Sequence, residues 1–255
     1  MPRPMIAAIA AIAALALLAG CGGETPETTV TARRLVTVTV TEGIDLPGQT
    51  VPTRTDTTTL WLGPGLARRD AHGGSYIVDT HRDLLTMIDH RDRTYTRNTT
   101  AAVAGQLAAL ARDTTGTGSR QQRQLQSLLD VGARVTDTGE TGTIDGYPVR
   151  RWIVEQQFGR QRTTSELWLT TAIDVDYALL HRATRPALAA LPGGEDAVAE
   201  LRKLRGVPVR SSAVIEVMGR QTPSRSRLVT ADLDTVPLSF FAPPEGYTET
   251  DQLSQ

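Results

Sequence analysis

Short alternating stretches, each followed by a turn signal, constrain the fold of this chain more than any other feature of its sequence. Val36, Val38 and Val40 alternate with threonines, which indicates a strand with one buried face and one wet face. Turn signals such as Gly63-Pro64-Gly65 and Gly73-Gly74 follow at short intervals. Between them we expect strands at about 54–62, 66–71, 75–79, 84–89 and 93–97. Regular short strands with tight turns predict an antiparallel meander.

The spacing of apolar residues changes further along the chain. A helical spacing predicts helices at about 103–111 and 119–129, and again within 174–205. Strands are expected to resume at about 134–141, 147–157, 162–170, 208–218 and 224–234. Asp145-Gly146 is the strongest local signal, because this pair between apolar runs favours a type I′ hairpin.

The order of these segments shows no regular strand–helix–strand alternation, so a parallel sheet is not expected. We predict an α+β fold, mainly antiparallel β, in a single domain over residues 31–250. A strongly curved sheet would have a concave face, and the two groups of inserted helices would cover it.

Residues 1–20 have the pattern of a secretory signal peptide. Arg3 supplies a positive charge, Met5 to Leu18 form an unbroken apolar run, and small residues follow. The run is shorter than the roughly 20 apolar residues that a membrane-spanning helix needs. Leu18-Ala19-Gly20-Cys21 resembles a lipobox, so Cys21 would carry acyl chains; the alternative is an ordinary signal peptide with an incidental cysteine at its end. Residues 21–30 would then be the lipidated cysteine and a flexible tether.

The composition excludes some classes of protein. Cys21 is the only cysteine, so a secreted form of the chain cannot form an internal disulfide and depends on packing for its stability. The anchor predicts attachment to a membrane surface without crossing it. The 27 basic and 28 acidic residues are nearly balanced, which argues against nucleic-acid binding. The basic residues are almost all arginine, which we attribute to genome composition and not to a binding patch.

No motif for catalysis or metal binding stands out. His72, His81 and His90 recur at a regular spacing, but they fall in successive turns of the expected meander and are interpreted as solvated turn residues. Asp137-Thr138-Gly139 is the tripeptide of aspartic proteases, yet those enzymes need two such loops with facing carboxylates. We interpret the tripeptide as a turn. The chain has no nucleophile elbow or phosphate loop, so we expect a non-enzymatic protein without a metal or other cofactor.

Apolar strand residues are the candidates for a ligand site. The set that we expect on the inner surface of the sheet comprises Trp61, Leu85, Met87, Trp152, Val154, Leu167, Leu169, Ile215 and Val217. Trp168 is a further candidate for that surface. One interpretation is an ordinary core that the helices fill. The other is a cavity for an apolar ligand between the sheet and the helices.

Several segments together resemble a known family. They are Tyr76-Ile77-Val78-Asp79, Leu84 to Asp89 with Arg93-Thr94-Tyr95-Thr96, Gly142 to Trp152, Ser165 to Thr170, and Pro244-Glu245-Gly246-Tyr247. Over roughly residues 33–248 the chain resembles the domain-of-unknown-function family numbered 4412, which is related to the periplasmic lipoprotein carriers LolA and LolB. The resemblance implies a half-open β-barrel with helices plugging its concave side. In the carriers, that concavity holds acyl chains.

We therefore hypothesise a membrane-anchored lipoprotein of the cell envelope that binds a lipid or another hydrophobic molecule in the covered concave face. An envelope-stress sensor and a structural envelope lipoprotein with a filled core are the alternatives. Gly22 stands where an inner-membrane retention signal has aspartate, so the outer membrane, facing the periplasm, is expected in a Gram-negative cell. LolA is soluble and LolB is anchored, so an anchored chain favours a binder or receptor over a shuttle.

Overall fold

A single large sheet dominates the computed structural model, which describes residues 28–46, 49–99, 101–103, 105, 131–159, 161–184, 188, 191, 193–217 and 220–251. The expected signal peptide, Cys21 and most of the tether lie outside the described residues. The expected helix at 119–129 and most of the one at 103–111 lie outside them as well.

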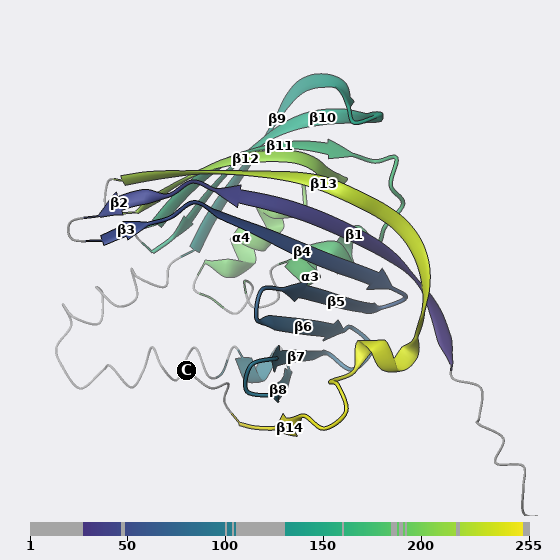
Figure 1. Cartoon of the computed structure of the whole chain (residues 1–255). Helices are drawn as coiled ribbons and strands as arrows, with labels where there is room; N and C mark the ends of the chain where they lie inside the picture. The colour runs from purple at the N-terminus through teal and green to yellow at the C-terminus, as the bar shows by residue number, and fades with distance from the viewer. Residues whose placement is uncertain are drawn as a thin grey trace, which may run out of the picture.

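The sheet has twelve strands in the order β14-β8-β7-β6-β5-β4-β1-β13-β12-β11-β10-β9 (Figure 1). Its neighbouring strands are antiparallel except for β14, which pairs in parallel with β8. The first half contains β1 (Thr29–Thr41), β4 (Arg54–Gly63), β5 (Leu66–Ala71), β6 (Gly74–Asp79), β7 (Leu84–Asp89) and β8 (Thr94–Thr99). The second half contains β9 (Val131–Ile144), β10 (Tyr147–Phe158), β11 (Gln161–Thr170), β12 (Val207–Val217) and β13 (Arg220–Pro237). The short strand β14 (Thr248–Glu249) lies beside β8 at the edge of the first half. A separate hairpin joins β2 (Ile44–Leu46) to β3 (Gln49–Val51).

The local sequence signals locate these strands well. The expected meander is confirmed, because β4 to β8 pair in chain order. The Asp145-Gly146 turn between β9 and β10 is also confirmed: both residues have positive φ, at 51° and 83°, as a type I′ turn requires. Aspartate and glycine tolerate this left-handed conformation at a low energetic cost.

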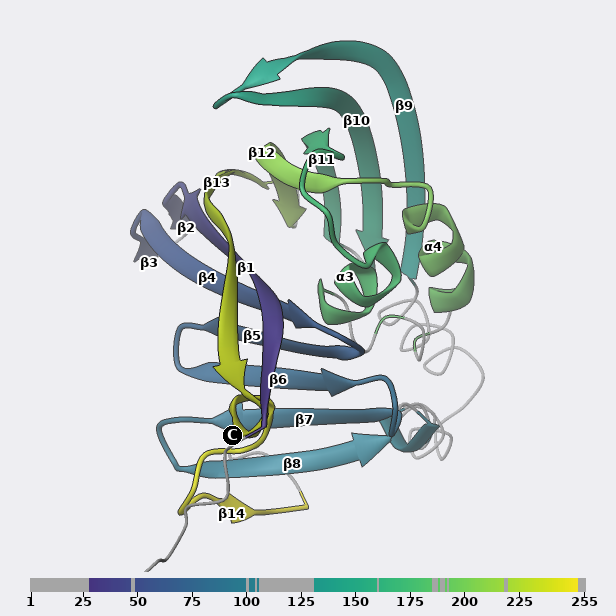
Figure 2. The ribbon, with the colours of Figure 1, turned by 90° about the vertical axis from the view of Figure 1, so that its right-hand side faces the viewer.

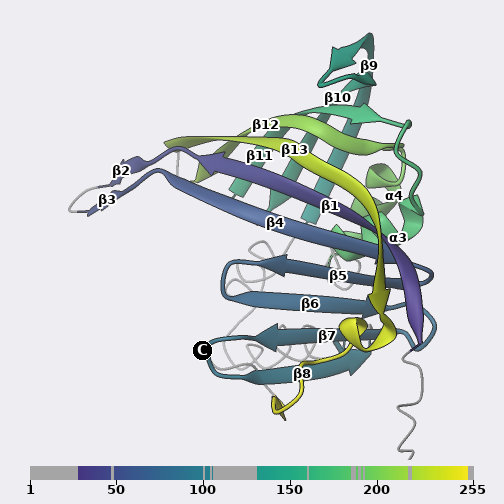
Figure 3. The ribbon, with the colours of Figure 1, turned by 45° about the vertical axis from the view of Figure 1, so that its right-hand side comes forward.

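The pairing of β1 with β13 joins the two halves of the sheet and has no local signal. Thr29 pairs with Pro237 and Thr41 with Ser224, so β13 runs beside the whole of β1 before it turns toward the C-terminal segment (Figure 3). A register shift between Val36 and Thr37 marks a β-bulge midway along this pair. Such bulges bend a strand and increase its twist.

Two short helices pack against one face of the sheet, which we call the helix face (Figure 2). Helix α3 (Tyr177–Thr184) begins at Asp176, whose carboxylate accepts hydrogen bonds from the backbone N–H groups of Ala178 and Leu179. Its buried residues pack on strands of the first half, and Leu201 of α4 (Gly194–Leu201) packs on Val154. No helix among the described residues is long and apolar enough to cross a membrane.

The opposite face, which we call the outer face, has a second core in the first half of the sheet. Ala32 and Ile77 pack there against Phe241 of the short 3-10 helix η3 (Leu238–Phe241). The neighbouring Phe240 ring meets Trp61 edge to face, with 5.0 Å between ring centroids. The chain thus covers this part of the outer face with its own C-terminal segment.

The expected half-open LolA-like barrel with helices covering its concave face is wrong. The sheet of the described residues is open, with β14 at one edge and β9 at the other. Helices α3 and α4 have only eight residues each and cannot cover a twelve-stranded sheet. Alternation and turn residues show where strands lie. Closure depends on pairing between strands far apart in sequence, which those local patterns do not encode.

The β9 edge carries features that limit further pairing. The backbone N–H of Val135 donates to the Glu200 carboxylate of α4, with 3.2 Å between the atoms. A register shift opposite Arg150 and Trp152 interrupts the β9–β10 ladder around Gly139, whose φ is 75°. Figure 2 shows the β9–β10 hairpin curling over at the top of the sheet.

Candidate functional site

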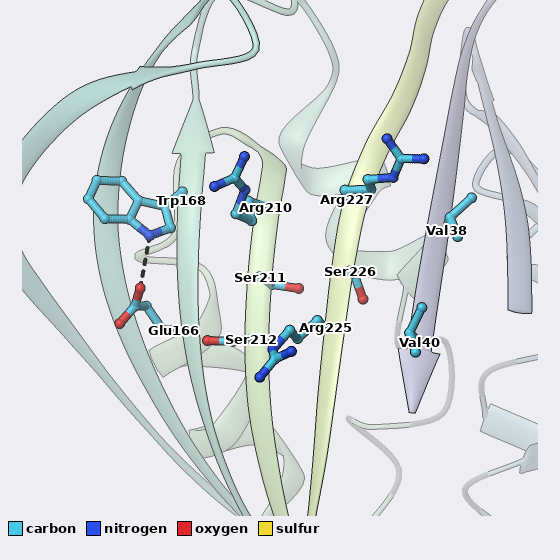
Figure 4. A pocket seen from close by; sticks show the side chains of 10 residues that line it. All are labelled: Val38, Val40, Glu166, Trp168, Arg210, Ser211, Ser212, Arg225, Ser226 and Arg227. Atoms are coloured by element: carbon cyan, nitrogen blue, oxygen red, sulfur yellow. Dashed lines mark hydrogen bonds between the residues drawn. The ribbon is translucent and has the colours of Figure 1, made fainter. Parts of the chain in front are cut away.

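A hollow of about 530 Å³ lies on the outer face in the second half of the sheet (Figure 4). We call it the arginine hollow. It is lined by Val38, Val40, Glu166, Trp168, Arg210, Ser211, Ser212, Arg225, Ser226 and Arg227. These residues come from β1, β11, β12 and β13, so four adjacent strands build one continuous floor.

Strand register arranges the outward side chains of the hollow in two rows across these four strands. The first row is Trp168, Arg210, Arg227 and Val38, and each residue pairs with the next. The second row is Glu166, Ser212, Arg225 and Val40, and these residues pair in the same way. Directly paired residues place their Cβ atoms about 4.5–5.5 Å apart, so each row forms a line of touching side chains.

The period of two in β11 explains why this set points outward. Leu169 is buried at 3% exposure and belongs to the core cluster under α4. Trp168 precedes it and therefore points to the opposite face. The same alternation sends Val38 and Val40 to the outer face, whereas Leu35, beyond the bulge, packs in the core on the helix face.

Among the described residues that line the hollow, Glu166 is the only carboxylate, and it is already engaged. Glu166 accepts a hydrogen bond from Arg151 at 2.6 Å and another from the indole N–H of Trp168 at 2.9 Å. These bonds fix the tryptophan ring at one end of the hollow, as Figure 4 shows. Together with Glu140, Glu166 raises the pKa of Arg151, because a nearby negative charge favours the protonated guanidinium.

The three arginines of the hollow have weak charge partners or none among the described residues. The Arg210 guanidinium lies 3.9 Å from Asp145, and Arg225 lies 3.7 Å from Glu42. Both arginine side chains are largely exposed, at 57% and 76%. Within the described part of the chain, no carboxylate lies within 4.0 Å of the Arg227 guanidinium. The hollow therefore carries excess positive charge.

The sequence-predicted ligand residues lie mainly on the other face of the sheet. Leu85 is in the core under α3, whereas Trp152, Val154, Leu167 and Leu169 form the core under α4. By strand position, the partly exposed Ile215 and the 41% exposed Met87 also point to the helix face. The side chain of Val217 lies outside what the structure describes.

Trp61 is the exception in that set, because it packs under Phe240 on the outer face. The structure therefore does not bring the predicted residues together in one cavity. Four of them share the α4 core, and the others are spread over the sheet. Trp168, also expected on the inner surface, lies instead in the hollow on the outer face.

The sequence contains a local signal for the hollow: the spacing of its arginines and valines within strands. The high overall arginine content makes this signal easy to overlook. Arg225 and Arg227 are two residues apart in a strand, so they share a face. Val38 and Val40 show the same spacing on β1. Genome composition alone does not account for the placement of these arginines, because the pairing of β1, β13 and β12 gathers them in one place.

A second group of polar side chains in the described residues forms a hydrogen-bond network in the first half of the sheet. The Ser75 hydroxyl lies 2.5 Å from Asp70 and 2.6 Å from His90 Nε2, and His90 Nδ1 lies 3.0 Å from the Tyr247 hydroxyl. This network ties β6 to the C-terminal segment. His90 is therefore not the solvated turn residue that we expected, whereas His72 and His81 are exposed. No group of three or more potential metal ligands occurs in the described segments.

Asp137-Thr138-Gly139 forms the bulge of β9. Asp137 bonds Arg150 at 2.7 Å and the backbone N–H of Gly139 at 2.9 Å, as in a local turn. These two bonds lower the pKa of the Asp137 carboxyl. The interpretation of the tripeptide as a turn fits this geometry.

The fold and the hollow together define an open antiparallel sheet with a positively charged, partly apolar site on one face. No family model matches this chain, and no curated protein matches it. The chain is similar to a solved structure of PNGF-II in space group C2, with a TM-score of 0.41 and 11% identity. The match covers 87% of this chain but 31% of the PNGF-II chain, so this protein spans about a third of that length. A score this low carries no argument about fold or function, and membership of family 4412 stays a prediction.

Proposed function

We propose that this protein is a lipid-anchored, non-enzymatic protein of the cell envelope that binds a lipid-like ligand in the arginine hollow. The observation that carries the proposal is the hollow itself. Its volume of about 530 Å³ falls in the range of about 300–1,000 Å³ that small-molecule sites occupy. This proposal moves the ligand from the helix-covered face, where we first expected it, to the outer face.

The walls of the hollow suit a molecule with both an apolar and a polar part. Val38 and Val40 supply aliphatic surface at one end, and Trp168 supplies an aromatic ring at the other. Val40 is 38% exposed, so its apolar surface is available to a ligand. Burying apolar surface contributes about 25 cal/mol per Å², and a chain lying across both ends would gain from each.

Tryptophan fluorescence tests which face binds the ligand. We would titrate the detergent-solubilised, full-length protein with a single-chain lysophospholipid whose acyl chain carries bromine, a contact quencher. The proposal expects quenching that Trp168→Phe removes and Trp61→Phe leaves. Quenching lost with Trp152→Phe would move the ligand to the helix face and contradict the proposal.

A structural envelope lipoprotein with a filled core is the second candidate. The burial of Val154 at 1% and Leu169 at 3% favours it, because these predicted ligand residues are packed in a core. In that case the brominated lipid would quench none of the three tryptophans.

The anchor rests on the lipobox-like Leu18-Ala19-Gly20-Cys21. Two or three acyl chains attach a protein stably to a membrane, since each buried CH₂ contributes about 0.8 kcal/mol. We expect Cys21→Ser to release the protein from the membrane fraction on cell fractionation. Unchanged membrane association of this variant would contradict a lipid anchor on Cys21.

A further inference from the structure

We infer that the arginine hollow selects amphiphiles with an anionic oxygen headgroup, a phosphate or a carboxylate, over neutral and zwitterionic ones. This inference rests on the proposed function and adds the charge of the ligand. The guanidiniums of Arg210, Arg225 and Arg227 would hold the headgroup over β12 and β13. The acyl chain would lie along the hollow, between the apolar surfaces of Val38 on β1 and Trp168 on β11.

The first argument is the charge left over in the hollow. The described lining residues include three guanidiniums and one carboxylate, Glu166, which already bonds Arg151 and Trp168. The nearest carboxylates to Arg210 and Arg225 lie beyond normal hydrogen-bond length, at 3.9 and 3.7 Å. A bound anion would supply the acceptors that these guanidiniums lack.

The second argument is the direct pairing of two like charges. Arg210 and Arg227 occupy opposite positions of the β12–β13 ladder. Like charges in directly opposed positions destabilise a sheet. An anion that bridges both guanidiniums turns this repulsion into attraction, and the planar fork of each guanidinium suits the paired oxygens of a phosphate or carboxylate.

The third argument is a contrast on the same face of the same sheet. Arg34, on β1, forms salt bridges with Asp232 at 3.1 Å and with Asp234 at 2.7 Å. The chain therefore supplies two carboxylates to an arginine beneath its own C-terminal segment. In the hollow, the register places valine and serine beside the arginines where carboxylates could stand, which leaves the positive charge for a ligand.

The test compares single-chain lipids with the same acyl chain and different headgroups. The full-length protein in a neutral detergent is titrated with lysophosphatidylglycerol, which is anionic, and with lysophosphatidylcholine, which is zwitterionic. We expect the anionic lipid to bind at least about tenfold more tightly, the effect of roughly one charge-assisted hydrogen bond. The preference should shrink as salt rises, because the hollow is open to solvent. Laurate tests a carboxylate headgroup, and inorganic phosphate tests the headgroup without a chain.

Single substitutions test whether the preference for the anionic lipid arises in the arginine hollow. Arg227→Gln and Arg210→Gln should each reduce the preference about tenfold. Zwitterionic binding should fall less, because the choline ammonium offsets the charge of the phosphate that the two lipids share. Arg82→Gln is the matched control, because Arg82 is 77% exposed and lies in the β6–β7 turn, away from the hollow. Thermal unfolding of each variant verifies that it is folded.

The outcomes separate the inference from the proposed function. Equal binding of both lipids overturns the inference and leaves the proposed function standing, whereas binding of neither overturns both. An equal loss of preference in Arg82→Gln would also overturn the inference, because the effect would then belong to the overall charge of the protein. Binding of laurate supports the inference with a carboxylate headgroup. Displacement of the lipid by inorganic phosphate supports it with the phosphate group alone.

Discussion

The two halves of the outer face differ in what covers them. In the first half, Phe240 and Phe241 of η3 lie over Trp61, Ala32 and Ile77 and complete a core. In the second half, the outer face carries the arginine hollow. None of the described segments packs over this hollow to form a core. One face of the sheet therefore contributes to a core at one end and carries a solvent-accessible hollow at the other.

Arginines show the same difference at the level of single side chains. In the covered half, Arg68 bonds Asp70 at 2.9 Å and the Phe240 carbonyl at 2.8 Å, and its guanidinium lies 4.5 Å from the centre of the Phe240 ring. In the open half, Arg227 has no such partner within the described residues. The position of an arginine in the sheet, and not its frequency in the sequence, therefore decides which partners it has within the protein.

The largest expected change in the free energy of unfolding concerns η3, the segment that covers the first half of the outer face. Phe241 is 8% exposed and packs close to Gly63, so Phe241→Ala should leave a cavity and lower the free energy of unfolding by about 3–5 kcal/mol. Urea unfolding followed by circular dichroism measures this loss. Phe158→Ala is the control: Phe158 is 47% exposed, and its removal should change stability by less than about 0.5 kcal/mol. Similar losses for both variants would mean that the C-terminal segment is not part of a core.

A smaller loss of stability is expected when Arg34, which forms two salt bridges, is replaced. Arg34→Met removes both salt bridges and leaves Asp232 and Asp234 facing each other without a cation. The Arg34 side chain is 34% exposed, so solvent screens the interaction, and we expect a loss of about 1 kcal/mol in urea unfolding. A gain in stability would contradict the role that we assign to this arginine.

Replacing Arg227 in the hollow should raise the free energy of unfolding, whereas replacing Arg34 should lower it. Arg227→Met removes the repulsion with Arg210 and should raise the free energy of unfolding by about 0.5 kcal/mol in low salt without ligand. Added salt should reduce this gain, because the pair is open to solvent. A loss equal to that of Arg34→Met would show that the two halves do not differ in this way.

The smallest effect concerns the β9 bulge in the open half, and it depends on pH. Arg150 and the Gly139 N–H lower the pKa of Asp137, so its ionised form is favoured in the folded state. The stabilisation is complete above the ordinary aspartate pKa of about 3.9 and is lost as pH falls through the lowered folded value. The difference in stability between wild type and Asp137→Asn should therefore be present at pH 7 and vanish in acid. A difference that grows in acid would contradict the assignment.

The sequence predicts individual strands better than it predicts their arrangement. Residues 66–71 and 84–89 are strands at the expected bounds, because turn residues at both ends define them locally. Helices α3 and α4 also lie within residues 174–205, where helical spacing of apolar residues predicts them. The half-open barrel was wrong because the pairing of β1 with β13 joins residues almost two hundred positions apart.

The candidate site was harder to predict than the strands, because it too depends on the pairing of strands far apart in sequence. Apolar residues such as Val154 and Leu169 are recognisable from the sequence, but core and ligand cavity share the same pattern until the packing is known. The hollow needs four strands in register, and its three arginines lie on two of them, β12 and β13. Spacing within β13 showed that Arg225 and Arg227 share a face, and nothing local showed what lies beside them.

The hydrogen bond from the Val135 N–H to Glu200 at the β9 edge affects whether separate molecules associate edge to edge. A free edge strand of fourteen residues is a template on which a neighbouring chain can add its own strand and start fibre growth. The Glu200 carboxylate occupies a donor that such a strand would need, and the bulge at Gly139 breaks the flat ladder beyond it. Copies crowded on a membrane by the proposed anchor would therefore remain separate molecules instead of polymerising edge to edge.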